Sequence, residues 1–218
     1  MRFLLIDTCG SEGSVALANT ELDDAVVAAE TLPGRTASER LIAAVRRVME
    51  SRGWRLRDLT AVVVVHGPGS FTGVRVGLSA AKGLSEAGGV PLIAVSRLAL
   101  LAAQGGGGVV HAVLDAGRGE FYFGEYRGHK RLREALLVIE DLLPTVAGGT
   151  VVVCEAKVAQ ALSQLSPRIV AEPGAVETLP FAMERAVAGE FDDAATLDAN
   201  YLRRTDVEIF AKPKIAVG

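Results

Sequence analysis

The strongest constraint on the fold is an order of predicted elements that occurs twice along the chain. Short apolar, β-branched runs predict strands, and apolar residues three and four positions apart predict helices. In the first half the order is strand, strand, strand, helix, strand, helix, strand, helix, at 3–7, 14–18, 25–31, 38–52, 61–65, 73–86, 92–95 and 97–104. In the second half this order recurs at 109–115, 120–126, 131–139, 140–146, 151–154, 156–165, 169–171 and 177–188. Two α/β units with one layout predict an internally duplicated chain.

Four consecutive glycines, Gly105–Gly108, separate the two halves and predict a linker. We expect an N-terminal lobe over residues 1–104 and a C-terminal lobe over residues 109–218, whose last segment is free to return to the first lobe. This layout is similar to the duplicated fold of the actin/hexokinase/Hsp70 (ASKHA) superfamily, in which ribonuclease-H-like units form two lobes. The predicted fold class is therefore α/β with two such units.

Each half ends its first predicted strand with an aspartate before a glycine-containing turn, at Asp7 and at Asp115. In the superfamily, an acid at this position faces nucleotide phosphates in the cleft between the lobes. Glu12 and Glu120 add negative charge where phosphate would lie, so we interpret the two aspartates as vestigial phosphate-loop positions. The alternative is that each aspartate only caps its own turn.

The segment Gly67–Gly77, with the sequence GPGSFTGVRVG, follows a predicted buried strand and leads into a predicted helix. Ser70 or Thr72 can cap this helix, and a helix N-terminus can hold an anion. The spacing does not match a Walker-type loop, because Val74 and Arg75 stand where Lys and Ser/Thr are required. It does not match a dinucleotide fingerprint either. We interpret the segment as a turn that sets the angle of the helix, with ligand binding as the second possibility.

Composition and charge narrow the functional classes. The chain has 218 residues, 50% of them hydrophobic, which is enough for a large core. A formal net charge of −3 does not suit a protein that binds nucleic acid over its whole surface, so RNA contact is expected only at a local patch. The candidate patch is the basic tail, Arg203-Arg204 and Lys212-Pro-Lys214, although a solvated tail is the favoured interpretation.

The cysteines and the first residues predict the cellular compartment. Cys9 and Cys154 are far apart in the sequence, so we expect no disulfide framework and a reducing, cytoplasmic location. The apolar start of the chain reaches Asp7 too soon to be a signal peptide or a membrane span, so no membrane association is expected.

Several short blocks together resemble one family. They are Ile6-Asp-Thr8, Gly13-Ser-Val-Ala-Leu17, Gly67-Pro-Gly-Ser-Phe-Thr-Gly-Val-Arg75, Asp115-Ala116 with Gly119-Glu120 and Tyr122, and Tyr201-Leu-Arg203. On these residues the chain resembles the TsaB (YeaZ) family over nearly its full length. The block Gly-Pro-Gly-Ser-Phe-Thr-Gly is the most specific of them.

The resemblance implies a non-catalytic subunit of the bacterial machinery that makes N6-threonylcarbamoyladenosine in tRNAs reading codons that start with A. A paralogue, TsaD, carries the metal and transfers the threonylcarbamoyl group, and an ATPase subunit, TsaE, joins the pair. The resemblance also implies a homodimer when TsaD is absent, and contact with tRNA only indirectly, through the complex. No catalytic residue, cofactor or metal of its own is implied.

In the family the docking face is built from the first two helices of the N-terminal lobe, here 38–52 and 73–86. The candidate interface residues are Leu41, Val45, Val48, Gly73, Val74, Gly77, Leu78 and Ala81. Glycine inside a helix costs about 1 kcal/mol against alanine, so the small residues four positions apart need a reason. One reason is the close approach of a partner helix. The other is packing within the chain's own lobe, and the sequence leaves both open.

Two enzyme classes are the rivals of this interpretation. A nucleotide-hydrolysing enzyme or phosphotransferase of the ASKHA superfamily would use Asp7 and Asp115. A metallopeptidase would need a metal site, but His66, His111 and His129 form no H-x-x-x-H pair. The histidines are therefore interpreted as structural.

Overall fold

The computed structural model describes residues 1–146 and 148–202, and in these residues the chain forms two five-stranded mixed sheets. The first sheet has the order β3-β2-β1-β4-β5, with β1 (Arg2–Asp7), β2 (Gly13–Asn19), β3 (Val26–Leu32), β4 (Ala61–Val65) and β5 (Leu92–Val95). The second has the order β10-β9-β6-β7-β8, with β6 (Val109–Gly117), β7 (Glu120–Arg127), β8 (Lys130–Val138), β9 (Thr150–Val153) and β10 (Arg168–Ile169).

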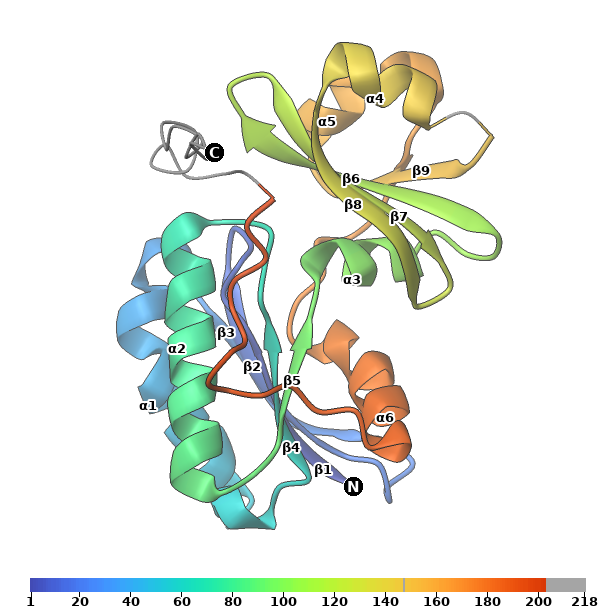
Figure 1. Ribbon diagram of the computed structural model, residues 1–218. Helices are drawn as coiled ribbons and strands as arrows, with labels where there is room; N and C mark the ends of the chain where they lie inside the picture. Colours follow the sequence, from blue (N-terminus) through green and yellow to red (C-terminus); the bar gives the residue numbers. More distant parts are fainter. Residues whose placement is uncertain (147, 203–218) are drawn as a thin grey trace, which may run out of the picture.

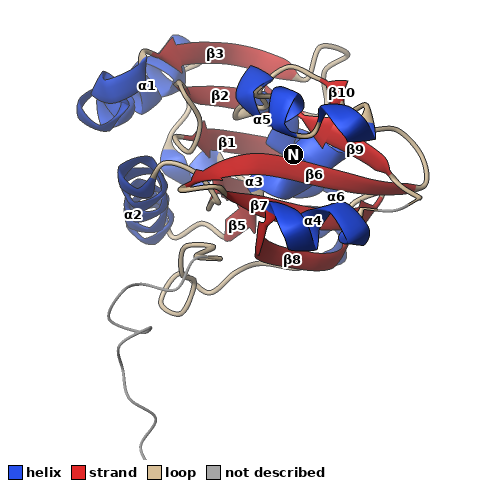
Figure 2. Ribbon diagram, turned by 90° about the horizontal axis from the view of Figure 1, so that it is seen from above, coloured by secondary structure: helices blue, strands red, loops and turns tan. Residues whose placement is uncertain are grey.

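The two sheets have the same topology. In each, the first three strands are antiparallel neighbours, and the fourth and fifth run parallel to the first. In Figure 2 the two sheets are stacked with their strand orders reversed, so that β3 lies on the same side as β10 and β5 on the same side as β8. The predicted duplicated α/β fold is confirmed.

The helices cover the outer faces of the sheets and fill the space between them (Figure 1). They are α1 (Ala37–Ser51), α2 (Phe71–Gly88), α3 (Arg97–Ala103), α4 (Ile139–Thr145), α5 (Ala156–Ala161) and α6 (Leu179–Ala188). In both views α1 and α2 lie together on one side of the first sheet (Figures 1 and 2). In the part of the chain that the structure describes, no helix is long and apolar enough to cross a membrane.

Alternation along β1 explains why the first sheet is buried on both faces. Leu4 and Ile6 pack with α1 and α2, whereas Phe3 and Leu5 point into the core between the sheets. All four side chains are fully buried. A strand covered on both faces reads as a continuous apolar run, as this one does.

The end of the described chain packs against the first sheet. The Arg185 guanidinium on α6 donates to the Ala94 carbonyl at 3.0 Å and pairs with Asp192 at 2.9 Å. Further along, the Asn200 amide donates to the His66 carbonyl at 2.8 Å, so the last described residues run beside α2 (Figure 1). Since α3 packs on β6 and β7, the helices at the end of each half cross between the halves. The lobe boundaries at 1–104 and 109–218 stay a prediction.

Candidate functional site

The glycine-rich segment Gly67–Gly77 contains the turn that joins β4 to α2 and the first two turns of α2 itself, and it is fixed to two other parts of the fold. The Ser70 amide donates to the Cys9 carbonyl at 3.0 Å, and the Gly67 carbonyl accepts from the Arg97 amide at 2.8 Å. Ser70, and not Thr72, caps α2, because its Oγ accepts from the Gly73 amide at 3.3 Å. The turn therefore connects the start of α2 to the end of β1 and to the start of α3.

The glycines of α2 serve close packing inside the chain. A Cβ atom on Gly73 would lie 1.9 Å from the Thr8 carbonyl oxygen, and one on Gly77 would lie 2.3 Å from the Thr8 Oγ1. The Thr8 hydroxyl donates to the Gly73 carbonyl at 2.6 Å. Of the two reasons that the sequence left open, packing within the chain's own lobe is the one that the structure shows.

The other candidate interface residues are also buried in the chain's own core. Leu41, Val45, Val48, Leu78 and Ala81 belong to one apolar cluster between the first sheet and its two helices, and Val74 belongs to the cluster between the two sheets. Each of the six is at most 6% exposed. An apolar stripe at helical spacing marks the face that a helix buries against its own sheet. These side chains therefore pack within the chain's own core, and their role as partner contacts stays a prediction. The prediction that α1 and α2 form the docking face stays a prediction.

An apolar groove lies on the solvent side of α1 and α2. It encloses about 270 Å³ and is lined by Ile42, Val45, Arg46, Met49, Glu50, Trp54, Leu56 and Leu84. The Ile42 side chain is 56% exposed, which is unusual for a residue of this type on a helix that otherwise packs on a sheet. Arg46 and Glu50 pair with each other at 2.9 Å, so the charges on this groove neutralise one another.

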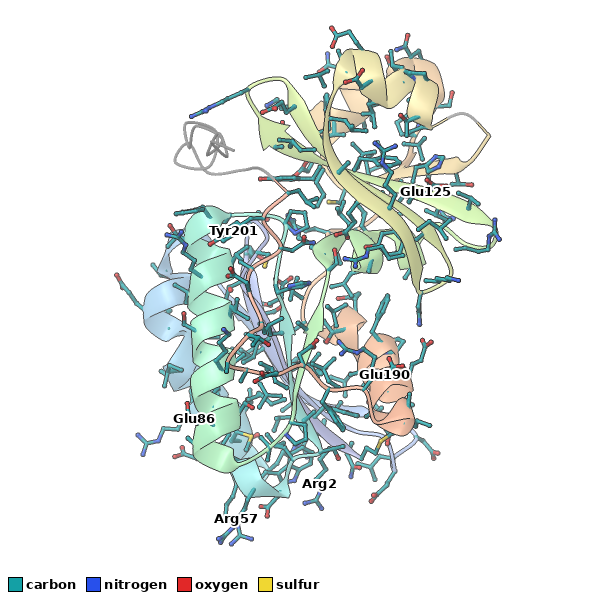
Figure 3. The ribbon with its side chains drawn as sticks, viewed as in Figure 1. Arg2, Arg57, Glu86, Glu125, Glu190 and Tyr201 are labelled. Atoms are coloured by element: carbon teal, nitrogen blue, oxygen red, sulfur yellow. The ribbon has the colours of Figure 1, made fainter. Side chains whose placement is uncertain are left out.

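An aromatic cluster lies at the start of α2. The Arg75 guanidinium lies 3.7 Å from the centre of the Phe71 ring, and its Nε donates to the Tyr201 hydroxyl at 2.7 Å. The Phe71 side chain is 53% exposed. Figure 3 shows Tyr201 at this end of α2, with Glu86 at the other end. Arginine and aromatic side chains of this kind are enriched among the residues that carry binding energy at interfaces.

Asp7 is enclosed by the turn that it was expected to cap. Its carboxylate accepts from the Cys9 amide at 2.8 Å, and it is 1% exposed. Burial raises the pKa of this carboxyl to about 6, against the bond from Cys9 and the charge of Arg97, which lower it. Asp115 caps its own turn in the same way, since its carboxylate accepts from the Gly117 amide at 3.0 Å.

The carboxylate of Glu172, which follows β10, occupies the turn between β1 and β2. The Ser11 amide donates to it at 2.9 Å, and the Ser11 hydroxyl and the Arg97 guanidinium also bond to it. Although burial opposes ionisation, these bonds lower the pKa of Glu172. The turn at which a nucleotide enzyme of this fold would hold phosphate thus binds an internal carboxylate.

Asp115 is bound to a cation of its own lobe. The Lys157 ammonium group lies 2.9 Å from its carboxylate and lowers its pKa, and the Asp115 amide donates to Glu155 at 2.7 Å. Among the described residues no group of three His, Cys, Asp or Glu side chains is placed to hold a metal ion.

We expect Asp7→Asn to stabilise the fold at neutral pH. The folded pKa lies above the ordinary 3.8, so the stability that the protonated carboxyl supplies is lost as the pH rises through about 6. An amide keeps an acceptor for Cys9 without a buried charge, so we expect a gain of about 2 kcal/mol at about pH 7.5 that shrinks at about pH 4.5. Urea denaturation at both pH values measures it. Asp115→Asn is the matched control: the pKa of Asp115 is lowered, so this substitution should reduce the free energy of unfolding at neutral pH. An equal gain in stability at both pH values for Asp7→Asn would contradict the assignment.

Sequence reasoning missed a basic hairpin. Arg127, Lys130, Arg131 and Arg133 lie around the turn between β7 and β8, and all four are exposed. The signal in the sequence is four cations within seven residues, a larger basic cluster than either of those in the tail. Those tail residues, Arg203-Arg204 and Lys212-Pro-Lys214, lie outside the described residues.

Comparisons with known proteins agree with the motif blocks. A family model described as "TsaD: tRNA N6-adenosine threonylcarbamoyltransferase" matches residues 31–148. The "tRNA threonylcarbamoyladenosine biosynthesis protein TsaB" of Escherichia coli is 39% identical over 131 residues, which cover 58% of this chain and 55% of that protein. The TsaB of Bacillus subtilis is 34% identical over 146 residues, covering 66% of this chain and 62% of that protein. The alignments thus span less than two thirds of these curated relatives.

A solved structure extends the similarity to nearly the whole chain. "YeaZ from Pseudomonas aeruginosa" superposes with a TM-score of 0.73 at 27% sequence identity, and the match covers 92% of this chain and 99% of that one. The family model, which covers more than half of the chain, is that of the related transferase TsaD. The two sequence relatives are named TsaB, and the structural neighbour is named YeaZ. The chain belongs to the TsaB (YeaZ) family.

Proposed function

We propose that the protein is a non-catalytic subunit that binds a TsaD-type transferase, joined by TsaE, and supports threonylcarbamoyl transfer to the N6 of adenosine in tRNAs that read A-starting codons. The observation that carries the proposal is the exposed apolar groove over α1 and α2. The relatives of this chain are named as biosynthesis proteins of this modification, and the matching family model is named for the transferase.

The groove has the composition of an interface centre. Ile42 and Leu84 supply aliphatic surface and Trp54 an aromatic ring, while Arg46 and Glu50 neutralise each other. Interface centres are depleted in unpaired charge and enriched in aromatic residues. The Phe71–Arg75–Tyr201 cluster at the start of α2 is a second, separate candidate contact area. In the absence of the transferase, the same surface supports pairing of two copies of this chain.

The non-catalytic role is supported by how the candidate nucleotide residues are used. Asp7 is buried and bonded to its own turn, Asp115 pairs with Lys157, and the turn after β1 already binds the Glu172 carboxylate. A carboxylate on that turn repels the phosphates that a nucleotide would bring there. Nucleotide hydrolysis at this cleft would first require Glu172 to leave Ser11 and Arg97.

The masses of the species in solution test the proposal. We expect the chain alone to form a dimer, the chain mixed with its cognate TsaD to form a mixed complex, and TsaE with ATP to join that complex. Light scattering after size-exclusion chromatography measures these masses. Failure to bind TsaD would contradict the docking role. ATP hydrolysis by the isolated chain that Asp7→Asn with Asp115→Asn abolishes would contradict the non-catalytic role and favour the nucleotide-hydrolysing alternative.

A further inference from the structure

The hairpin of β7 and β8 presents three cations on one face. Arg127 lies directly opposite Lys130, and Arg133 lies opposite Glu125, with Leu132 as the extra residue of a bulge in β8. Directly opposed residues of antiparallel strands point to the same side, as do residues two apart on one strand. Arg127, Lys130 and Arg133 therefore share a face with Glu125, which Figure 3 labels in the second lobe. We call these three residues the cationic face.

The other face of the hairpin and its tip make contacts within the molecule. On its other face the Tyr126 hydroxyl bonds to Glu134, and Glu134 also bonds to Ser96 and, at 2.8 Å, to Asn200. At the tip, the His129 ring stacks on Phe181 of α6 at 4.0 Å between ring centres. Its Nδ1 lies 2.6 Å from the Glu184 carboxylate. The hairpin is thus held along one face and at its tip, which lies beside α6 (Figure 1), and the cationic face has a fixed orientation.

The cationic face carries more positive than negative charge, because Glu125 lies on the same face opposite Arg133 but forms no ion pair with it in the described residues. In the described residues, none of its three members forms an ion pair, whereas Arg131 on the opposite face lies 3.8 Å from Glu134. Like charges directly opposite each other across a β-ladder, such as Arg127 and Lys130, destabilise the pair. An anionic partner would remove this repulsion.

We propose that the cationic face binds the phosphate backbone of a folded RNA, and that in the assembly this RNA is the tRNA substrate. The identity of the RNA rests on the proposed function. Guanidinium groups bind phosphate oxygens in bidentate geometry, and Lys130 adds a point charge. These contacts read no base sequence, so they position the tRNA without selecting it.

The surroundings of the cationic face favour RNA over a membrane or a protein partner. Membrane-surface binding needs apolar side chains that insert next to the cations, and protein interfaces need an aromatic or aliphatic anchor. Within the described hairpin segment from Arg127 to Arg133, the exposed large apolar side chain is Leu132, which is 43% exposed and is the extra residue of the bulge. The hairpin holds its cations at a fixed spacing, and the backbone of a folded RNA holds its phosphates at a fixed spacing, so several cations can contact phosphates at once.

The test uses the complex with TsaD and an unmodified tRNA transcript that reads an A-starting codon. For Arg127→Gln with Arg133→Gln we expect the Kd for tRNA to rise about tenfold at about 0.1 M salt, and the slope of log Kd against log salt to fall by about 1.5. The control is Arg118→Gln with Arg168→Gln, which removes two exposed charges at the opposite end of β7 and on the opposite edge strand of the same sheet. This control should change the Kd less than twofold. Association with TsaD should be unchanged in both variants.

Each contrary outcome has a separate meaning. Equal tRNA affinity in the hairpin variant and the wild type, or an equal loss in the control, would overturn the proposal. Binding to anionic phospholipid vesicles that the hairpin substitutions abolish, while tRNA binding is kept, would assign the face to a membrane. If the chain does not bind TsaD, the proposed function fails. The role of the hairpin is then tested by titrating tRNA into the isolated chain at about 20 mM salt and comparing the Kd of the hairpin variant with those of the wild type and the control variant.

Discussion

Replacing Gly73 by alanine is expected to lower the free energy of unfolding by about 3 kcal/mol or more. The new Cβ would lie 1.9 Å from the carbonyl oxygen of Thr8, which is backbone and cannot rotate away. Thr8 directly follows β1, the central strand of the first sheet, and β1 is held between β2 and β4, so the Thr8 backbone cannot easily shift. The helix would have to move as a unit, which would also break the bond from the Thr8 hydroxyl to the Gly73 carbonyl.

Gly83 provides the matched control on the same helix. Nothing lies within 4 Å of a Cβ built there, and the position is exposed. Gly83→Ala should therefore raise the free energy of unfolding by about 0.5–1 kcal/mol, the ordinary gain of alanine over glycine in a helix. Urea denaturation of both variants measures the two values. Two changes of the same sign would show that helix propensity, and not contact with Thr8, decides the role of Gly73.

The sequence predicted the elements well because each strand and helix is marked by local composition. Strands Ala61–Val65 and Leu92–Val95 are found with the predicted bounds, and the repeated order of elements correctly predicts one topology for both sheets. The close packing of the α2 glycines is also indicated by the sequence, because glycine inside a helix costs about 1 kcal/mol relative to alanine and so points to a close contact. Their contact, Thr8, is 65 positions from Gly73, and no local pattern indicates which distant residue fills such a space.

The candidate site was harder to predict because burial and binding favour the same residue types. Leu41, Val45 and Val48 are predicted partner contacts because they lie on a helix of the family's docking face, and in the structure their side chains pack on the chain's own sheet. Ile42, one position from Leu41, is the residue left outside, and only the angle between helix and sheet decides this. The place of Glu172 on the turn after β1 depends on how the two sheets meet, which sequence periodicity does not encode.

Replacing Ile42 by glutamate is expected to weaken binding to TsaD by about a hundredfold while leaving the fold intact. The side chain is 56% exposed in the isolated chain, so a carboxylate there remains in water until the partner covers it. Docking would then bury an unpaired charge among Trp54, Leu56 and Leu84, and the nearby Arg46 is already paired with Glu50. Isothermal titration calorimetry with TsaD measures the loss.

Leu22→Glu is the control for this prediction, because it makes the same kind of change at a similarly exposed apolar residue. Leu22 is 52% exposed and lies in the turn between β2 and β3, outside the groove. We expect its affinity for TsaD to stay within about twofold of the wild type, since surface substitutions away from a contact change binding little. If Ile42→Glu binds TsaD as tightly as Leu22→Glu does, the docking surface is not the groove over α1 and α2. The Phe71–Arg75–Tyr201 cluster at the start of α2 would then be the surface to test, with Arg75→Ala as the variant that removes both the cation over the ring and the bond to the tyrosine hydroxyl.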